Sequence, residues 1–233
     1  MQGYFITGTD TEVGKTWISL GLVEALKRQG HKVGVMKPVS AGCEQTVAGL
    51  RNEDALLLQQ RSNVALGYDA INPYAFAPAI APHIAAAEAG LRMDIETLRK
   101  HYLDIAAQSD CVVVEGAGGW QVPLNDFQTL ADLARRLELP VILVVGLRLG
   151  CLNHALLTVA SIRASGLPLA GWVANQLLPR MDRLDENLQT LEQWIDAPLL
   201  GRIPYLEALQ VETIADHLRL PPARNSLRPD WAI

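Results

Sequence analysis

The sequence predicts an α/β protein of one domain, in which a mostly parallel sheet is covered by helices on both faces. Two observations carry this prediction. Short runs such as CVVVE (111–115) and PVILVV (140–145) are apolar at consecutive positions, which is typical of strands buried on both sides. Stretches of helical length separate these runs, and this alternation is expected of β-α-β units.

The N-terminal third predicts two strands and two helices. GYFIT (3–7) reads as a short buried strand, and 15–30 reads as a helix that Gly30 can end in the left-handed region. The apolar stripe of this helix comprises Ile18, Gly21, Leu22, Ala25 and Leu26. HKVGVMK (31–37) predicts the second strand, and 52–60 predicts a helix with acidic residues in its first turn.

The rest of the chain continues the alternation. Further strands are expected at 111–115, 140–145, 169–175 and 197–203. Further helices are expected at 91–109, 127–138, 151–165 and 182–195. The Ala- and Pro-rich segment 62–90 shows no clear pattern, and Trp172 and Trp194 are read as core residues. Because there is no linker or internal repeat, we expect 1–233 to form a single domain with a Pro-rich, loosely attached tail at about 218–233.

Composition excludes several classes of protein. The net charge of −5 comes without a cluster of basic residues, which argues against a nucleic-acid surface. No apolar run reaches the roughly 18 residues of a membrane span, and the N-terminus lacks the basic region of a signal peptide. The cysteines, Cys43, Cys111 and Cys151, are odd in number and lack metal-ligand spacing. We therefore expect a cytoplasmic protein that binds neither nucleic acid nor membrane.

The stretch GTDTEVGKT (8–16) predicts a phosphate-binding loop, and with it a P-loop NTPase-like fold. The common form has four residues between its first glycine and Gly-Lys-Ser/Thr, whereas five separate Gly8 from Gly14 here. The strand before and the helix after are nevertheless the required context, and favour a phosphate site over an ordinary turn. Lys15 would reach the phosphates of a nucleotide, and the Thr16 hydroxyl would bind Mg²⁺.

Three charged residues stand where ligands bind in such sheets, after a strand or at the start of a helix. Glu115 ends an apolar strand and precedes GAGG (116–119), a pattern typical of a Mg²⁺-binding carboxylate, although an ordinary strand-terminal acid is the alternative. Lys37 could face the same site as Lys15 or be a solvated lysine at a strand end, and spacing alone does not favour either. Asp54, in a first helical turn, requires no functional explanation by itself.

Gly150 precedes another expected helix, at 151–165. The first amide groups of that helix could receive a carboxylate from a ligand. Capping by the side chain of Asn153 is the alternative, and the residues alone favour it.

Together these motifs resemble the dethiobiotin synthetase family from about residue 3 to residue 206. The motifs that carry the resemblance are GTDTEVGKT, KPVSAGCE, RNEDAL, INPYAF with APHIAA, VVVEGAGGW, PVILVVG, GCLNHALLT, GWVAN and GRIPYL. The loop with one additional residue is this family's own form. The resemblance implies a cytoplasmic, homodimeric ligase of biotin biosynthesis. It would use ATP and Mg²⁺ to join CO₂ to 7,8-diaminononanoate, forming dethiobiotin through a carbamate and a carbamic–phosphoric anhydride.

The resemblance also implies roles for particular residues. The catalytic residues would be Lys15, Lys37 and Thr11, and the Mg²⁺ ligands would be Thr16, Asp54 and Glu115. ATP would be bound by Glu12, Val13, Gly14, Lys15, Thr16, Trp17, Asp54, Glu115, Gly116, Ala117, Gly118, Asn175, Gln176, Pro204, Tyr205 and Leu206. The diamine would be bound by Lys37, Ser40, Ala41, Gly118, Gly150, Cys151, Leu152 and Asn153, the last four receiving its carboxylate from the partner subunit. Family members often carry a hydroxyl at the position of Ala41, and in this chain Ser40 is the nearest one.

Three other classes are weighed against this reading. ATP-driven switches of the chromosome-partition or septum-site kind carry a lysine five residues before the loop lysine, where this chain has Asp10. Small-molecule kinases usually bring an Arg-rich lid to the phosphates, and the arginines are scattered here. Amide-forming ligases of large cofactor precursors normally add a glutamine-hydrolysing domain, for which 233 residues leave no room.

Overall fold

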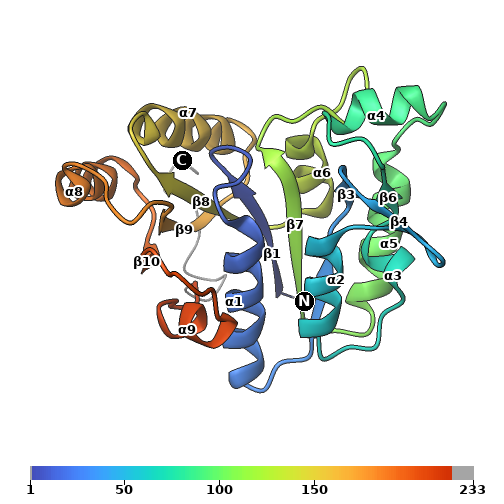
Figure 1. Cartoon of the computed structure of the whole chain (residues 1–233), viewed down its shortest axis with the longest axis horizontal. Helices are drawn as coiled ribbons and strands as arrows, with labels where there is room; N and C mark the ends of the chain where they lie inside the picture. Colours follow the sequence, from blue (N-terminus) through green and yellow to red (C-terminus); the bar gives the residue numbers. More distant parts are fainter. Residues whose placement is uncertain (1, 222–233) are drawn as a thin grey trace, which may run out of the picture.

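A six-stranded parallel sheet lies at the centre of the computed structural model, which describes residues 2–221 (Figure 1). The strand order is β10-β9-β8-β1-β7-β2, and each neighbouring pair is parallel. The strands are β1 (Gln2–Gly8), β2 (Val33–Met36), β7 (Cys111–Gly119), β8 (Val141–Leu147), β9 (Leu169–Gln176) and β10 (Leu199–Ile203). This confirms the predicted fold class. The carboxyl ends of β1, β2 and β7 therefore meet at one edge.

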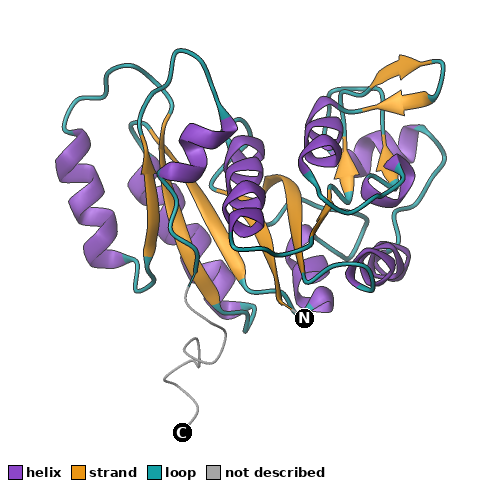
Figure 2. Ribbon diagram, turned by 90° about the horizontal axis from the view of Figure 1, so that it is seen from below, coloured by secondary structure: helices purple, strands orange, loops and turns teal. Residues whose placement is uncertain are grey.

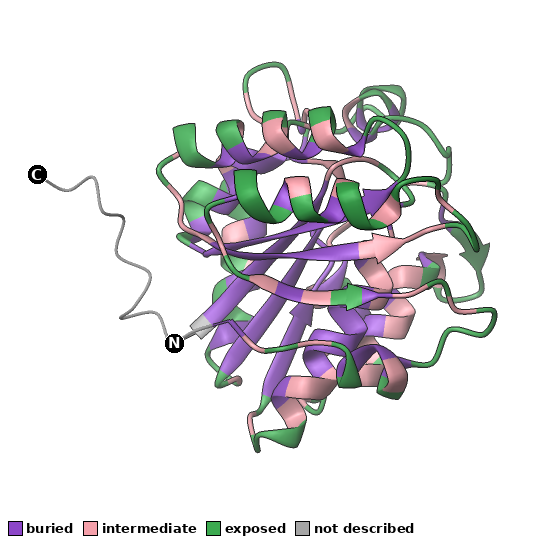
Figure 3. Ribbon diagram, turned by 90° about the vertical axis from the view of Figure 1, so that its left-hand side faces the viewer, coloured by how far each residue is buried: buried purple, intermediate pink, exposed green. Residues whose placement is uncertain are grey.

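Helices cover both faces of the sheet, so that three layers result (Figure 2). Alternate strand residues face opposite layers: Phe5 packs with one hydrophobic cluster, and Tyr4 and Ile6 pack with the other. The Phe5 side is built on α5 (Ile95–Ala106), α6 (Leu130–Leu137), α7 (Cys151–Ala164) and α8 (Leu184–Trp194), joined by α4 (Pro82–Glu88). The Tyr4 side is built on α1 (Lys15–Arg28), α2 (Glu53–Arg61), α3 (Tyr68–Ile71) and α9 (Val211–Asp216). Buried strands thus lie between helices whose outer faces are exposed (Figure 3).

Short elements occupy the stretches without a sequence pattern. β3 (Val39–Ser40) pairs in parallel with β6 (Tyr74–Ala75), while β4 (Glu44–Thr46) and β5 (Gly49–Arg51) form an antiparallel hairpin. Segment 62–90 contains α3, β6 and α4, which are four, two and seven residues long. Elements of this length complete too few turns or pleats to show periodicity, which explains why the sequence did not predict them.

Capping residues move two helix starts inward from their predicted positions. α5 begins at Ile95 rather than 91 because the carboxylate of Asp94 accepts hydrogen bonds from the backbone of Glu96 and Thr97. α6 begins at Leu130 rather than 127 because Thr129 forms a capping box with Asp132.

The two tryptophans read as core residues have different outcomes. Trp172 is fully buried in β9, as predicted, but the prediction for Trp194 is wrong, since 65% of its surface is exposed at the end of α8. Most of the expected tail, 222–233, lies outside the described residues. Within residues 2–221, no helix has the length and apolar character needed to span a bilayer.

Candidate active site

The loop between β1 and α1 has the conformation of an anion-binding turn. Gly14 adopts a left-handed conformation (φ 89°) directly before Lys15, the first residue of α1. A side chain on Gly14 would overlap the amide of Asn175, whose Nδ2 donates to the Val13 carbonyl over 2.9 Å. The first backbone bond at the start of α1 runs from Ile18 to Gly14, so the preceding N–H groups point out of the helix start. The loop is thus held from β9 and open toward a ligand.

Lys15 is a buried ammonium at this helix start. Its side chain is largely enclosed, and Nζ donates to the carbonyl of Asp10 over 2.8 Å. Burial, followed by the nearby charge of Lys37, lowers the pKa of Lys15 to about 8. An anionic ligand would stabilise the charged form, so the electrostatics favour phosphate at this place.

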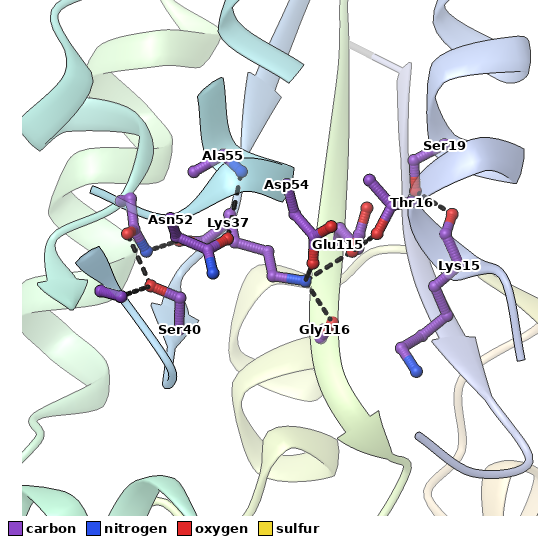
Figure 4. Close-up of polar contacts among 12 residues, drawn as sticks. Lys15, Thr16, Ser19, Lys37, Ser40, Asn52, Asp54, Ala55, Glu115 and Gly116 are labelled. Carbon is purple, nitrogen blue, oxygen red and sulfur yellow. Dashed lines mark hydrogen bonds and ion pairs between the residues drawn. The ribbon is translucent and has the colours of Figure 1, made fainter. Parts of the chain in front are cut away.

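Lys37, after β2, joins the two carboxylates near the loop. Its Nζ lies 2.5 Å from Oε1 of Glu115, 3.1 Å from Oδ2 of Asp54 and 3.5 Å from the carbonyl of Gly116 (Figure 4). Burial opposes the charge of Lys37, but Glu115 and then Asp54 outweigh it and raise its pKa. The structure therefore brings Lys37, Asp54 and Glu115 together, although they are distant in sequence.

Thr16 and the two carboxylates fit a Mg²⁺ ion. The Thr16 hydroxyl donates to Oε1 of Glu115 over 2.9 Å, and Oε2 of this fully buried residue has no hydrogen-bond partner. A buried carboxylate oxygen without a partner is costly, and a divalent cation would satisfy it. Among residues 2–221 no group of three or more His, Cys, Asp and Glu could hold a metal, so phosphate and water would have to complete the coordination.

A cavity of about 910 Å³ connects these groups. Its polar wall includes Thr11, Glu12, Gly14, Lys15, Thr16, Lys37, Ser40, Asn52, Asp54 and Glu115. Its other lining residues are mainly small or apolar: Trp17, Ala41, Ala79, Ile80, Ala81, Pro82, Ala117, Gly118, Val122 and Pro123. The lining therefore offers charged and polar groups to an anionic group and apolar surface to an aliphatic chain.

Several residues predicted to bind ligands do not line this cavity. They are Val13, Gly116, Gly150, Cys151, Leu152, Asn153, Asn175, Gln176, Pro204, Tyr205 and Leu206. Asn175 and Val13 nevertheless contact each other beneath the loop. Gln176 donates to the carbonyls of Leu178 and Pro179 instead of pointing to the cavity.

The start of α7 corrects one expectation. No side chain caps this helix, whose N-cap is Gly150 at φ 95°, so the favoured reading of Asn153 as a cap is wrong. The N–H of Cys151 donates to the carbonyl of Arg148 over 3.0 Å, and no side chain accepts from the N–H groups that follow it. The alternative, a carboxylate ligand at this helix start, stays a prediction.

The sequence did not identify Asn52 or the apolar wall of the cavity. Asn52 caps α2 through the backbone of Ala55 and lines the cavity beside Asp54. An asparagine directly before two acids is a recognisable capping signal, so Asn52 could have been found. The wall formed by 79–82 and 122–123 carries no sequence signal, because small apolar loop residues are common.

Comparison with known proteins identifies the chain. Residues 2–213 match a family model described as an AAA domain. The chain is 53% identical to the ATP-dependent dethiobiotin synthetase BioD of Pseudomonas aeruginosa over 95% of this chain and 98% of that protein. The proteins of the same name from Chromohalobacter salexigens and Aromatoleum aromaticum are 51% and 50% identical, covering 95% and 94% of this chain and 99% and 98% of those proteins. The chain belongs to the ATP-dependent dethiobiotin synthetase family.

This dethiobiotin synthetase family member shares its fold with cell-division proteins. The MinC:MinD cell division protein complex of Aquifex aeolicus superposes with a TM-score of 0.58 at 16% identity, covering 94% of this chain and 87% of that chain. MinD of the same organism gives 0.56 at 15% identity, covering 94% and 88%. Such low identity supports the fold alone. Asp10, at the position where the ATP-driven switches weighed in the sequence analysis carry a lysine, is paired with Arg148.

Proposed function

We propose that this chain is an ATP-dependent dethiobiotin synthetase that closes the ureido ring of dethiobiotin from 7,8-diaminononanoate and CO₂. The observation that carries this proposal is the convergence of Lys15, Lys37 and Glu115 on one cavity with an aliphatic wall. Family membership supports the same reaction. The reaction belongs to biotin biosynthesis. The three buried free cysteines suit the reducing cytoplasm, where we expect the enzyme to work.

ATP would bind with its phosphates in the loop. The backbone from Glu12 to Trp17 would surround the phosphates, and Lys15 would leave the Asp10 carbonyl to neutralise them. Asn175, at the end of β9, would contact the adenine, and Gln176 would lie near it. Pro204, Tyr205 and Leu206, directly after β10, would line the adenine pocket. Gly116, Ala117 and Gly118 allow the nucleotide to approach the backbone closely.

Mg²⁺ would be held by Thr16, Asp54 and Glu115. When bound, it neutralises charge on the transferring phosphate. Lys37 lies beside both carboxylates, so a small movement of its ammonium would bring it to the anionic substrate.

The reaction has to bring two anions together. One amine of the substrate adds to the carbon of CO₂ and loses a proton, giving a carbamate. A carbamate oxygen then takes the γ-phosphoryl group of ATP, with ADP as the leaving group. The second amine attacks the carbonyl of this mixed anhydride and loses a proton, which closes the ring and releases phosphate. Lys15 and Lys37 offset the repulsion between carbamate and phosphate, and the hydroxyl of Thr11 would orient the reacting group.

The diamine would extend along the apolar wall of the cavity. Ala41 and Gly118 would contact its amines or chain, as would Ser40 if the hydroxyl can accept a further bond. The carboxylate at the other end would bind at Gly150, Cys151, Leu152 and Asn153 of the second subunit in a homodimer. The start of α7 supports this role, because no side chain caps it and its backbone N–H groups can donate to an anion.

The test is a reaction of the purified chain with ATP, Mg²⁺, bicarbonate and 7,8-diaminononanoate. We expect ADP release that depends on the diamine, together with formation of dethiobiotin measured by mass spectrometry. ADP release that ignores the diamine, or the absence of ring product, would show that the proposed function is wrong. Sedimentation of the same sample tests the proposed dimer.

A further inference from the structure

The segment Ile71 to Phe76 runs beside the strand end that carries Lys37. The N–H of Lys37 donates to the carbonyl of Ile71 over 2.8 Å, and the N–H of Phe76 donates to the backbone carbonyl of Ser40 over 3.0 Å. This segment belongs to the motif INPYAF, to which the proposed mechanism assigns no role. Asn72 within it is only 3% exposed, and a polar side chain buried this deeply requires hydrogen-bond partners.

The side-chain amide of Asn72 binds four groups, one of which is the carbonyl of Tyr74, to which Nδ2 donates over 3.4 Å. Its Nδ2 donates to the backbone carbonyl of Lys37 over 2.7 Å. Its Oδ1 accepts from the hydroxyl of Ser40 over 2.7 Å and from that of Tyr68 over 2.9 Å. The orientation of the amide follows from these partners, because the carbonyl of Lys37 can only accept a hydrogen bond.

Tyr68 extends the network to the helix that carries Asp54. The phenol oxygen of Tyr68 accepts from the backbone N–H of Asn52 over 2.7 Å. Asn52 caps α2 by accepting from Ala55 over 3.2 Å, and Asp54 lies in this first turn (Figure 4). Asn72 therefore connects the backbone of Lys37 with the start of α2, whose Asp54 pairs with the ammonium of Lys37 over 3.1 Å.

We propose that Asn72 is a positioning residue that fixes Lys37 relative to Asp54 for the reaction. The inference rests on the proposed function, because it assigns Lys37 to the reacting groups. A displacement of about 1 Å in a catalytic group can cost about a hundredfold in rate. Lys15 and Thr16 belong to a loop and helix start between β1 and α1, which the hydrogen bonds of Asn72 do not reach. Asn72 should therefore affect the position of Lys37 and not the loop.

The test compares turnover with nucleotide binding in Asn72→Ala. We expect kcat for dethiobiotin formation to fall about 10- to 100-fold. Binding of ADP without divalent cation, measured by calorimetry, should stay within about twofold, since it depends on the Lys15 loop. A folded variant with unchanged kcat overturns the inference. An equal loss of ADP affinity and kcat also overturns it, because the damage would then be general.

Asn63→Ala is the matched control. Asn63 performs a similar task at the opposite end of β2: its Oδ1 accepts from the backbone of Val33 over 2.7 Å and its Nδ2 donates to that of His31 over 3.0 Å. We expect this variant to lose stability but to keep its kcat within about twofold. A loss of kcat equal to that of Asn72→Ala would overturn the inference.

Tyr68→Phe decides the question if Asn72→Ala does not fold. It removes only the hydroxyl, so we expect kcat to fall about three- to tenfold with ADP binding unchanged. Unchanged kcat in this variant overturns the inference. Failure of the proposed function is distinguishable, because in that case the unaltered chain itself would form no dethiobiotin.

Discussion

At the scale of single residues, the site is built on the buried ion pair between Lys37 and Glu115, in which one carboxylate oxygen has no partner. Glu115 is fully buried, yet one of its oxygens has no partner, and the other is shared by Lys37 and Thr16. Such a pair stabilises the fold little by itself, because desolvation offsets the attraction. We therefore propose that the pair serves function rather than stability, with the second oxygen of Glu115 available to a cation.

Lys37→Ala should reduce both turnover and stability. The variant loses a positive charge that acts on the transition state, so kcat should fall about a hundredfold or more, or ~3 kcal/mol. It also leaves Glu115 buried without its ammonium, which costs about 3 to 5 kcal/mol of unfolding free energy. Turnover assays and urea unfolding measure the two effects. Lys32→Ala, an exposed lysine before the same strand, is the control and should change neither. Near-normal turnover of Lys37→Ala would remove Lys37 from the mechanism.

Cys111 should be unreactive in the folded protein. Burial, with a smaller contribution from Asp110, raises the pKa of its thiol to about 12. Because only the thiolate reacts, about one molecule in ten thousand is reactive at pH 8. Alkylation followed by peptide mass spectrometry should therefore show slow labelling from pH 8 to 10. In urea, labelling should rise steeply near the ordinary thiol pKa. Equal rates at pH 8 in the folded and unfolded chain would contradict this.

At the scale of elements, the loop before α1 is constrained by the strand beside it. Gly14 has a positive φ and no room for a side chain, since Asn175 of β9 occupies the space. The nucleotide loop and the end of β9 therefore form one packed unit. We therefore expect phosphate binding to depend on this packing as well as on the residues of the loop.

Gly14→Ala tests this constraint against Gly30→Ala. Both glycines have a positive φ, 89° and 86°, but nothing lies within 4 Å of a side chain at Gly30. Gly30→Ala should therefore cost only about 1 to 2 kcal/mol of backbone strain and keep ADP binding. Gly14→Ala has the same strain plus the overlap with Asn175, and should lose ADP affinity at least tenfold. Equal ADP affinity in the two variants would show that the space beside Gly14 is unimportant.

At the scale of the whole molecule, stability comes from the two layers of helices on the sheet. The tryptophans of β9 and α8 show the contrast, because Trp172 is fully buried and Trp194 is 65% exposed. Their neighbours in sequence differ too: Trp172 stands in the apolar run LAGWVAN (169–175), whereas Glu192, Gln193 and Asp196 surround Trp194. These polar neighbours were a local signal for the exposure of Trp194.

Trp172→Ala and Trp194→Ala should therefore differ strongly in unfolding free energy. Removing the buried ring leaves a cavity and should cost about 3 to 5 kcal/mol. Removing the exposed ring should change the unfolding free energy by less than about 0.5 kcal/mol. Urea denaturation measures the unfolding free energies of both variants, provided that their m-values are equal. A large loss in Trp194→Ala would mean that a surface outside the described contacts covers this ring.

The sequence by itself determined the order of the large elements, the parallel sheet and the phosphate loop. Apolar runs, helical periods and the Gly-Lys-Thr motif are local signals, and each depends on residues close together in the chain. Lys37 and Glu115 were identified as candidates by their places at strand ends, but spacing left the role of Lys37 undecided.

Only the tertiary structure decided which of these candidates meet. Residues 37, 54 and 115 come together because β2 and β7 are neighbours in the sheet and the start of α2 lies beside Lys37. The role of Asn72 and the lack of a side-chain cap at the start of α7 are likewise invisible in the local sequence. Each depends on how chain segments that are far apart in the sequence pack together. The free energy of this packing, rather than local conformational preference, selects the arrangement.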